Sequence, residues 1–199
     1  MELKNNKVYE NICFSDLGFS KTIVKLCTFE RCEFKNCDFS ESEFRDCKFT
    51  ECVFKDSNLS LIKLIKARFV DTRFELCKII GVDWTLLDWA GVTLSAQIGF
   101  DSCDISYSAF NSLELPELVV KKCKVHNVGF ELCNLTGAQF CESDLANTRL
   151  NSSKLNECDF RGADNFVIDP TENSIVGAIF SFPEVLNLLS PFGVKIDQI

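Results

Sequence analysis

Apolar residues recur along this chain at every fifth position. One block of this register runs from Phe14 to Leu94, and a second block, shifted by one residue after Gly99, runs from Phe100 to Phe160. Every position in both blocks is apolar, and 15 of the 19 Phe residues lie on them. A period of five fits neither an α-helix, with about 3.6 residues per turn, nor a flat strand, with two. The pattern predicts a chain that turns a corner every five residues.

The position two residues before each of these apolar residues is mostly small. Ten of the 12 Cys residues occupy it, among them Cys27, Cys32 and Cys37. We expect both positions to point inward and the other three residues of each five to face water. If four sides close one coil, residues twenty apart stack at the ordinary interstrand spacing of about 4.8 Å.

The five-residue unit resembles the repeat A(D/N)LxX of the pentapeptide-repeat family. It appears here as Cys-Glu-Phe-Lys-Asn at 32–36, Cys-Asp-Phe-Ser-Glu at 37–41, Ala-Gln-Phe-Cys-Glu at 138–142 and Ser-Asp-Leu-Ala-Asn at 143–147. The resemblance implies an all-β fold, a right-handed quadrilateral β-helix. We assign residues 1–165 to this β-helix, with a register break near 95–99.

The remaining segment, residues 166–199, is expected to form a short strand–helix–strand module. Residues 174–181 are interpreted as a strand, Ser181 and Glu184 as a capping box, and 194–196 as a second strand. A helix of about two turns must bury its apolar face to be stable. It can cap the end of the rod or pack on a second copy, and a two-fold dimer is the commonest closed assembly. We therefore expect a homodimer joined through Ile179, Phe180, Phe182, Val185, Leu186, Leu188, Leu189 and Phe192.

The cysteines could serve metal binding, redox chemistry or packing. Zinc sites favour Cys pairs two to four residues apart, whereas the spacing here is set by the repeat. Stacked pairs such as Cys27 with Cys47 could approach disulfide distance, but the cytosol disfavours that bond. We expect free, buried thiols that pack as small apolar groups, and no metal site. His126, the only histidine, falls on an outward position and is expected to be an ordinary surface residue.

No motif of an enzyme is present in the sequence. There is no phosphate-binding loop, no G-x-S-x-G and no H-E-x-x-H. Carboxylates on a convex rod have no water-excluding pocket to shift their pKa. We expect a protein that is not an enzyme and needs no cofactor.

The net charge of −8 is unevenly distributed. Residues 1–100 carry 15 acids and 14 bases, and residues 101–199 carry 14 acids and 7 bases. This balance disfavours direct nucleic-acid binding, which needs a basic surface. The acids either keep the rod soluble or form a surface that binds a partner. The candidate partner-binding acids are Asp104, Glu114, Glu117, Glu131, Glu142, Asp144, Glu157 and Asp159.

Further segments narrow the resemblance within the family. Residues 58–62, Gly-Val-Asp-Trp-Thr at 81–85 with Trp89, and the end from Ile168 to Leu189 resemble topoisomerase-protecting proteins of the albicidin self-resistance, microcin B17 immunity and Qnr quinolone-resistance type. Loops as large as those of Qnr proteins are not evident. The resemblance implies a dimeric rod that binds DNA gyrase or topoisomerase IV and protects it from a poison. An acidic rod about as wide as a duplex could compete for a basic DNA-binding groove.

Alternatives remain open at this point. The chain could be a general interaction scaffold with another partner, and its contact surface would then lie around Trp84 and Trp89. The same region could instead be a local bulge that kinks the rod. The sequence shows neither the apolar run of a signal peptide nor a membrane span, so we expect a cytoplasmic protein that does not contact the membrane.

Overall fold

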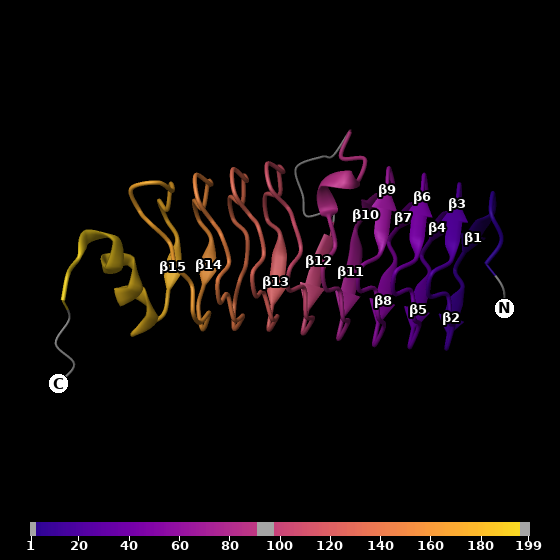
Figure 1. The fold of residues 1–199 in the computed structure, drawn as a ribbon, viewed down its shortest axis with the longest axis horizontal. Coiled ribbons are helices and arrows are strands. Elements are labelled where there is room, and N and C mark those ends of the chain that lie inside the picture. The colour runs from indigo at the N-terminus through magenta and orange to yellow at the C-terminus, as the bar shows by residue number, and fades with distance from the viewer. Residues whose placement is uncertain (1–2, 91–97, 196–199) are drawn as a thin grey trace.

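The computed structural model describes residues 3–90 and 98–195, which form a right-handed β-solenoid with four sides (Figure 1). In chain order we name the sides A, B, C and D. Successive coils pair in parallel, residue on residue, as in Tyr9 with Phe29 and Phe14 with Phe34. The predicted all-β quadrilateral fold is confirmed.

Three sides carry short strands. Side A contains β1 (Val8–Glu10), β4 (Thr28–Glu30), β7 (Lys48–Thr50) and β10 (Arg68–Val70). Side B contains β2 (Cys13–Ser15), β5 (Glu33–Lys35), β8 (Val53–Lys55), β11 (Thr72–Glu75), β12 (Ile98–Asp101), β13 (Val119–Lys121), β14 (Asp159–Phe160) and β15 (Ile179–Phe180). Side D contains β3 (Ile23–Lys25), β6 (Glu43–Arg45) and β9 (Lys63–Ile65).

Side C is held by single bridges in place of strands. The bridged row consists of Gly18, Asp38, Asn58, Lys78, Asp104, Lys124, Asp144 and Asp164. It closes the fourth side, so no open sheet edge runs along the length of the rod.

The core is a set of stacked columns, as the five-residue period predicts. Phe34 is fully buried, and its ring centroid lies 5.0 Å from that of Phe14 and 4.5 Å from that of Phe54. Neighbouring columns meet edge to face, as Phe34 and Phe39 do at 5.7 Å. Such offset and edge-to-face contacts add to the burial of the rings themselves. The small residues two positions earlier fill the gaps between columns.

The residues at the corners between sides adopt the left-handed backbone conformation. Glu51 has φ 51°, Glu117 has φ 59° and Gly162 has φ 68°. This conformation is strained for residues with a Cβ. Most corner amides donate to a carbonyl of the next coil, for example Glu51 N to Val70 O at 2.9 Å. These hydrogen bonds help to hold the turn where the residue itself disfavours it.

One coil is longer than the others, and the break differs from the expected one. Cys77 and Cys103 are stacked neighbours 26 residues apart, whereas Cys103 and Cys123 are 20 apart. The coil is regular as far as Asp88, whose amide donates to Ala67 O at 2.9 Å, and side B resumes where Ile98 pairs with Thr72. The chain therefore leaves the repeat after Asp88, earlier than the predicted 95–99. Of the predicted register, Leu94 lies outside the described residues.

The solenoid also extends one coil further than predicted. Residue 174 bridges to Lys154, and Phe180 stacks on Phe160 with centroids 5.1 Å apart. The predicted boundary at 165 and the strand over 174–181 are therefore wrong, since only Ile179–Phe180 forms a strand. Asn165 interrupts the apolar register, but the neighbouring Phe166 fills the core in its place.

A 3-10 helix, η2 (Glu184–Phe192), crosses the C-terminal end of the rod (Figure 1). The predicted capping box does not form, because the Ser181 hydroxyl accepts from Gly162 N at 2.9 Å and η2 has no side-chain cap. Leu188 packs against the core, so the segment covers the last coil. Val194 and Lys195 are not in a strand, and Ile196 lies outside the described residues. A second 3-10 turn, η1 (Trp84–Leu86), lies in the long coil, before its extra residues.

Candidate interaction surface

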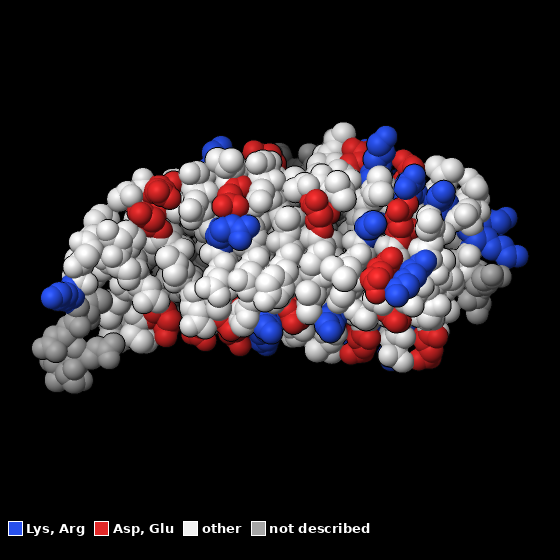
Figure 2. All heavy atoms as spheres, viewed as in Figure 1, with Lys and Arg blue, Asp and Glu red and all other residues white. Residues whose placement is uncertain are grey.

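Charge is distributed differently over the two halves of the rod. Figure 2 shows basic side chains gathered over the N-terminal coils, and fewer basic groups over the C-terminal half of this face. Acidic groups lie along the upper and lower margins of the same face. On this face the acidic side chains therefore lie along the margins of the rod and do not form one continuous acidic surface.

The eight predicted acids do not form a single patch. Glu114 lies on side A, Asp159 on side B, Asp104 and Asp144 on side C, and Glu131 on side D, while Glu117, Glu142 and Glu157 occupy corners. Two pairs share a row. Asp104 and Asp144 flank Lys124 on side C, and Glu117 and Glu157 flank Gly137 on the corner between sides A and B.

Half of these acids have a basic partner. Arg161 donates to Asp159 at 2.6 Å, and this pairing lowers the pKa of Asp159 to about 2. Glu131 lies 3.2 Å from Arg149, and Asp104 lies 3.9 Å from Lys124. The charges of these three acids are therefore partly neutralised by neighbouring basic side chains.

The fourth paired acid, Asp144, is held by the only histidine. His126 Nε2 lies 2.5 Å from Asp144 Oδ2, and Asn165 donates to Oδ1 at 2.8 Å. Partial burial alone would raise the pKa of Asp144, but these hydrogen bonds outweigh it and lower the pKa. His126 is half-buried and paired rather than an ordinary exposed residue, so the sequence expectation for it was incomplete.

The exposed corner acids form a longer feature that the sequence did not reveal. Glu51, Asp71, Glu117 and Glu157 occupy the same corner between sides A and B, all with positive φ. We call these four residues the acidic edge. It spans five coil spacings, roughly 24 Å at the ordinary interstrand distance. Within the described ranges, only Asp71 has an ion pair, with Arg73 at 3.7 Å.

The long coil hides this alignment in the sequence. Glu51 and Asp71 are twenty residues apart. In a regular repeat, each later member of the row would also follow the previous one by twenty residues. The extra residues before Ile98 shift every later position by six. A search that allowed for this shift would have placed Glu117 and Glu157 in line with Asp71.

The two tryptophans occupy different environments. Trp84 is fully buried and stacks on Phe110 with centroids 5.4 Å apart, so it cannot itself form a contact surface. Trp89 has left the register, and its indole nitrogen donates to Trp84 O at 3.0 Å. Trp84 thus takes a regular place in the stacked core. Trp89 is half-buried beside the long coil.

The residues predicted for a dimer interface divide into two groups. Phe180 stacks within the last coil, and Val185, Leu186 and Leu188 are half-buried against the end of the rod. Ile179, Phe182, Leu189 and Phe192 are exposed, and Phe182 most of all at 79%. We call these four exposed side chains the terminal apolar patch.

All twelve cysteines are free thiols, and ten of them are buried. Burial raises the pKa of Cys47 to about 12 and that of Cys52 to about 11, which suppresses the reactive thiolate. The expectation of free, buried thiols is confirmed for these ten. Cys13 is exposed and Cys141 half-buried. In residues 3–90 and 98–195, no three His, Cys, Asp or Glu side chains are placed to hold a metal ion.

Two family profiles match the chain. Residues 27–97 match the profile described as a pentapeptide repeat region, and residues 133–164 match the one described as eight copies of pentapeptide repeats. The chain belongs to the pentapeptide-repeat family. No curated protein sequence matches this pentapeptide-repeat protein.

Solved structures of the same architecture include two trypsin-treated variants of QnrB1, described as a plasmid-mediated fluoroquinolone resistance protein. The first is 14% identical with a TM-score of 0.63, and the alignment covers 98% of this chain and 99% of the trypsin-treated chain. The second is 17% identical with a TM-score of 0.56, covering 97% and 99%. At this identity the likeness shows the shared fold along the whole rod. Within the described parts of this protein, no helix has the length and apolar character to span a bilayer.

Proposed function

We propose that this pentapeptide-repeat protein is a non-enzymatic protection factor in the cytoplasm. It binds a type II topoisomerase, DNA gyrase or topoisomerase IV, and protects it from a poison such as albicidin or a quinolone. The observation that carries the proposal is the acidic edge, a line of carboxylates parallel to the rod axis. The fluoroquinolone-resistance description of QnrB1 supports it by analogy.

The acidic edge would act by resembling a nucleic-acid backbone. DNA presents regularly spaced negative charges along a rod, and proteins that bind it neutralise them with Lys and Arg. Carboxylates at multiples of the coil spacing can occupy the same basic groove, and long-range attraction accelerates the encounter. The protein would then compete with DNA without being cut or modified.

The terminal apolar patch would join two copies into a longer rod. Exposed aromatic side chains at an end of the molecule mark an interaction site. A two-fold axis at this end would bury Phe182 and Phe192 of both copies and double the length of the acidic edge. Analytical ultracentrifugation tests this: Phe182→Asp with Phe192→Asp should give monomers. The matched exposed change Val167→Asp should not, and a monomeric wild-type protein would contradict the dimer.

The function is tested by a gyrase supercoiling assay with and without albicidin or a quinolone. Wild-type protein should restore supercoiling in the presence of the poison. Glu117→Lys combined with Glu157→Lys should weaken gyrase binding by at least about tenfold, because it reverses both charges in the C-terminal half of the acidic edge.

A matched control is Glu41→Lys with Asp46→Lys. These residues are also exposed corner acids with positive φ. Glu41 lies at the corner between sides C and D, and Asp46 lies at the corner between sides D and A. If both double variants lose binding equally, net charge rather than the acidic edge is responsible. If wild-type protein leaves gyrase activity and drug sensitivity unchanged over a wide concentration range, the proposed function is wrong.

A further inference from the structure

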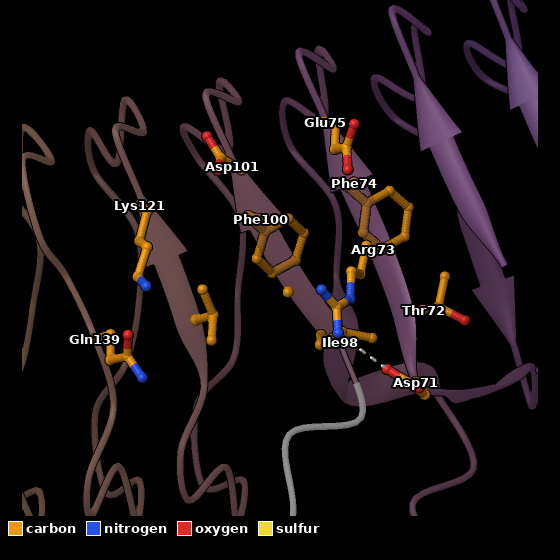
Figure 3. Close-up of a pocket in the computed structure, with 12 residues that line it drawn as sticks. Asp71, Thr72, Arg73, Phe74, Glu75, Ile98, Phe100, Asp101, Lys121 and Gln139 are labelled. Carbon is orange, nitrogen blue, oxygen red and sulfur yellow. Dashed lines mark ion pairs between the residues drawn. The ribbon is translucent and has the colours of Figure 1, made fainter. Parts of the chain in front are cut away.

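A hollow of about 300 Å³ lies on side B, where β11, β12 and β13 run side by side (Figure 3). The outward-facing row across these strands is Arg73, Gly99, Val119 and Gln139. Two long side chains thus flank two short ones. The hollow is the space above the short pair.

Neither the backbone nor the packing requires the glycine that opens this hollow. Gly99 does not adopt left-handed φ, and a Cβ at this position would lie 3.5 Å from Val119 Cβ, an ordinary contact. The same row accommodates Arg73 and Gln139 in neighbouring coils. A long side chain could therefore replace Gly99 without strain, and the hollow is a surface feature rather than a consequence of the fold.

The acids around the hollow already have hydrogen-bond or ion-pair partners, whereas the bases can donate further hydrogen bonds. Glu75 pairs with Lys55 at 3.5 Å, and Asp101 accepts from the Ser102 hydroxyl at 2.7 Å. Arg73 makes one long ion pair, with Asp71 at 3.7 Å. Lys121 makes no ion pair within 4 Å in the described ranges, although it is the register partner of Asp101.

The charged side chains around the hollow point toward the two opposite ends of the strands. In Figure 3 the guanidinium of Arg73 and the ammonium of Lys121 lie toward the end of the strands where β12 begins at Ile98. The amide of Gln139 and the carboxylate of Asp71, which pairs with Arg73, lie at the same end, whereas the carboxylates of Glu75 and Asp101 lie at the other. Because Gly99 follows Ile98, the two bases and the amide surround the floor of the hollow.

We propose that this hollow is a docking site for an aspartate or glutamate side chain of a protein partner. The carboxylate would receive hydrogen bonds from Arg73, Lys121 and Gln139, and charge-assisted bonds of this kind are the strong ones. The stem of the acidic side chain would rest on Gly99 and Val119. The site adjoins the acidic edge at Asp71, but it does not depend on the proposed function.

The charge of the whole molecule limits what can bind here. The net charge of −8, with Asp71, Glu75 and Asp101 around the rim, repels an extended polyanion such as nucleic acid. A single carboxylate on a protein surface brings one charge and is attracted at short range by the two bases. The hollow therefore fits an acidic side chain better than a phosphate chain.

Amide NMR with three capped peptides tests the proposal. Acetyl-Gly-Glu-Gly-amide should shift the Gly99 and Val119 amide signals in a saturable manner. Acetyl-Gly-Gln-Gly-amide should bind at least about tenfold more weakly, because the charge-assisted bonds are lost. Equal shifts with both peptides, or a preference for acetyl-Gly-Lys-Gly-amide, would overturn the proposal.

Two variants locate the binding. Gly99→Gln fills the hollow and should abolish the glutamate-dependent shifts, and Lys121→Glu should transfer the preference to the lysine peptide. Gly18→Gln is the matched control, since Gly18 also occupies an outward position, with nothing within 4 Å of its Cβ site, but on side C. Circular dichroism verifies that all variants fold. If Gly99→Gln binds the glutamate peptide as the wild type does, the hollow is not the site.

Discussion

The N-terminal coils, up to β11, and the C-terminal coils, from β12 onward, build the same fold with different cores. In the N-terminal half one column on side B is entirely aromatic, with Phe14, Phe34, Phe54 and Phe74 in line. In the C-terminal half the same column continues as Phe100, Val120, Phe140 and Phe160, with one aliphatic residue among the rings, and the side A column is entirely aliphatic, with Leu115, Leu135 and Leu155. Both halves are equally buried.

The surfaces differ as much as the cores. Acids and bases balance in residues 1–100, whereas acids outnumber bases two to one in residues 101–199. The pairing also changes, from strands on three sides to mostly single bridges. The comparison teaches that the coil needs only an apolar residue every fifth position and a small one two before it. Side-chain type and surface charge are then free to vary for binding.

The largest expected effect comes from breaking the aromatic column. Phe34→Ala should lower the free energy of unfolding by about 3–5 kcal/mol, because the ring touches Phe14 and Phe54 in its column and a cavity would remain. Leu135→Ala, the counterpart in the C-terminal half, should cost about 2–4 kcal/mol. Urea unfolding followed by circular dichroism measures both. Equal, small losses below about 1 kcal/mol would show that the columns do not hold the coils together.

A smaller effect should follow at the corners. Gly162→Ala should cost about 1 kcal/mol, because φ is 68° and the new Cβ would lie 3.3 Å from Glu142 Cγ. Gly18→Ala in the N-terminal half is the control, since Gly18 has ordinary φ and open space around it. The free energy of unfolding of the Gly18→Ala variant should stay within about 0.5 kcal/mol of the wild-type value. A similar loss at both glycines would argue against strain at the corner.

The smallest expected effect is pH-dependent. The folded pKa of Asp159 is about 2, below its unfolded value of about 3.9, because Arg161 favours the carboxylate. The pair should therefore stabilise the fold above about pH 4 and cease to do so as the pH falls through about 2. Since Arg161 is largely exposed, we expect a contribution of at most about 1 kcal/mol.

Asp159→Asn should remove this contribution at pH 7 and flatten the loss of stability between about pH 4 and 2. Glu43→Gln, which removes the pair with Arg45 in the N-terminal half, is the matched variant. Urea unfolding at a series of pH values measures both. An unchanged slope in Asp159→Asn would contradict the assignment of the pKa shift to this pair.

Much of the fold could be predicted from the sequence because each coil repeats one local rule. Phe34 and Cys32 could be placed in the core from their spacing alone, since every fifth residue and the residue two before it point inward. The end of the rod was less predictable. Asn165 breaks the pattern, but Phe166 restores the core, and only the pairing of Phe180 with Phe160 shows that another coil is present.

The candidate surfaces were less accessible to sequence analysis than the fold. Period five tells which residues face outward, but not which of the four sides they share once the register is interrupted. Asp104, Glu114 and Glu131 were grouped by charge, yet the structure distributes them over three sides. The hollow over Gly99 depends on side chains from three coils and has no signature along the chain.

The five-residue period, the inward-facing residues, the free thiols and the excess of acid in the second half can all be read from the chain alone. These follow from local rules, because hydrophobic burial selects the same positions in each coil. Only the tertiary structure decided the six-residue shift between β11 and β12, and with it the alignment of Asp71 with Glu117 and of Arg73 with Gly99 and Val119. The reason is physical: residues in neighbouring coils meet through backbone pairing, and that pairing, not distance along the chain, sets which charges lie side by side.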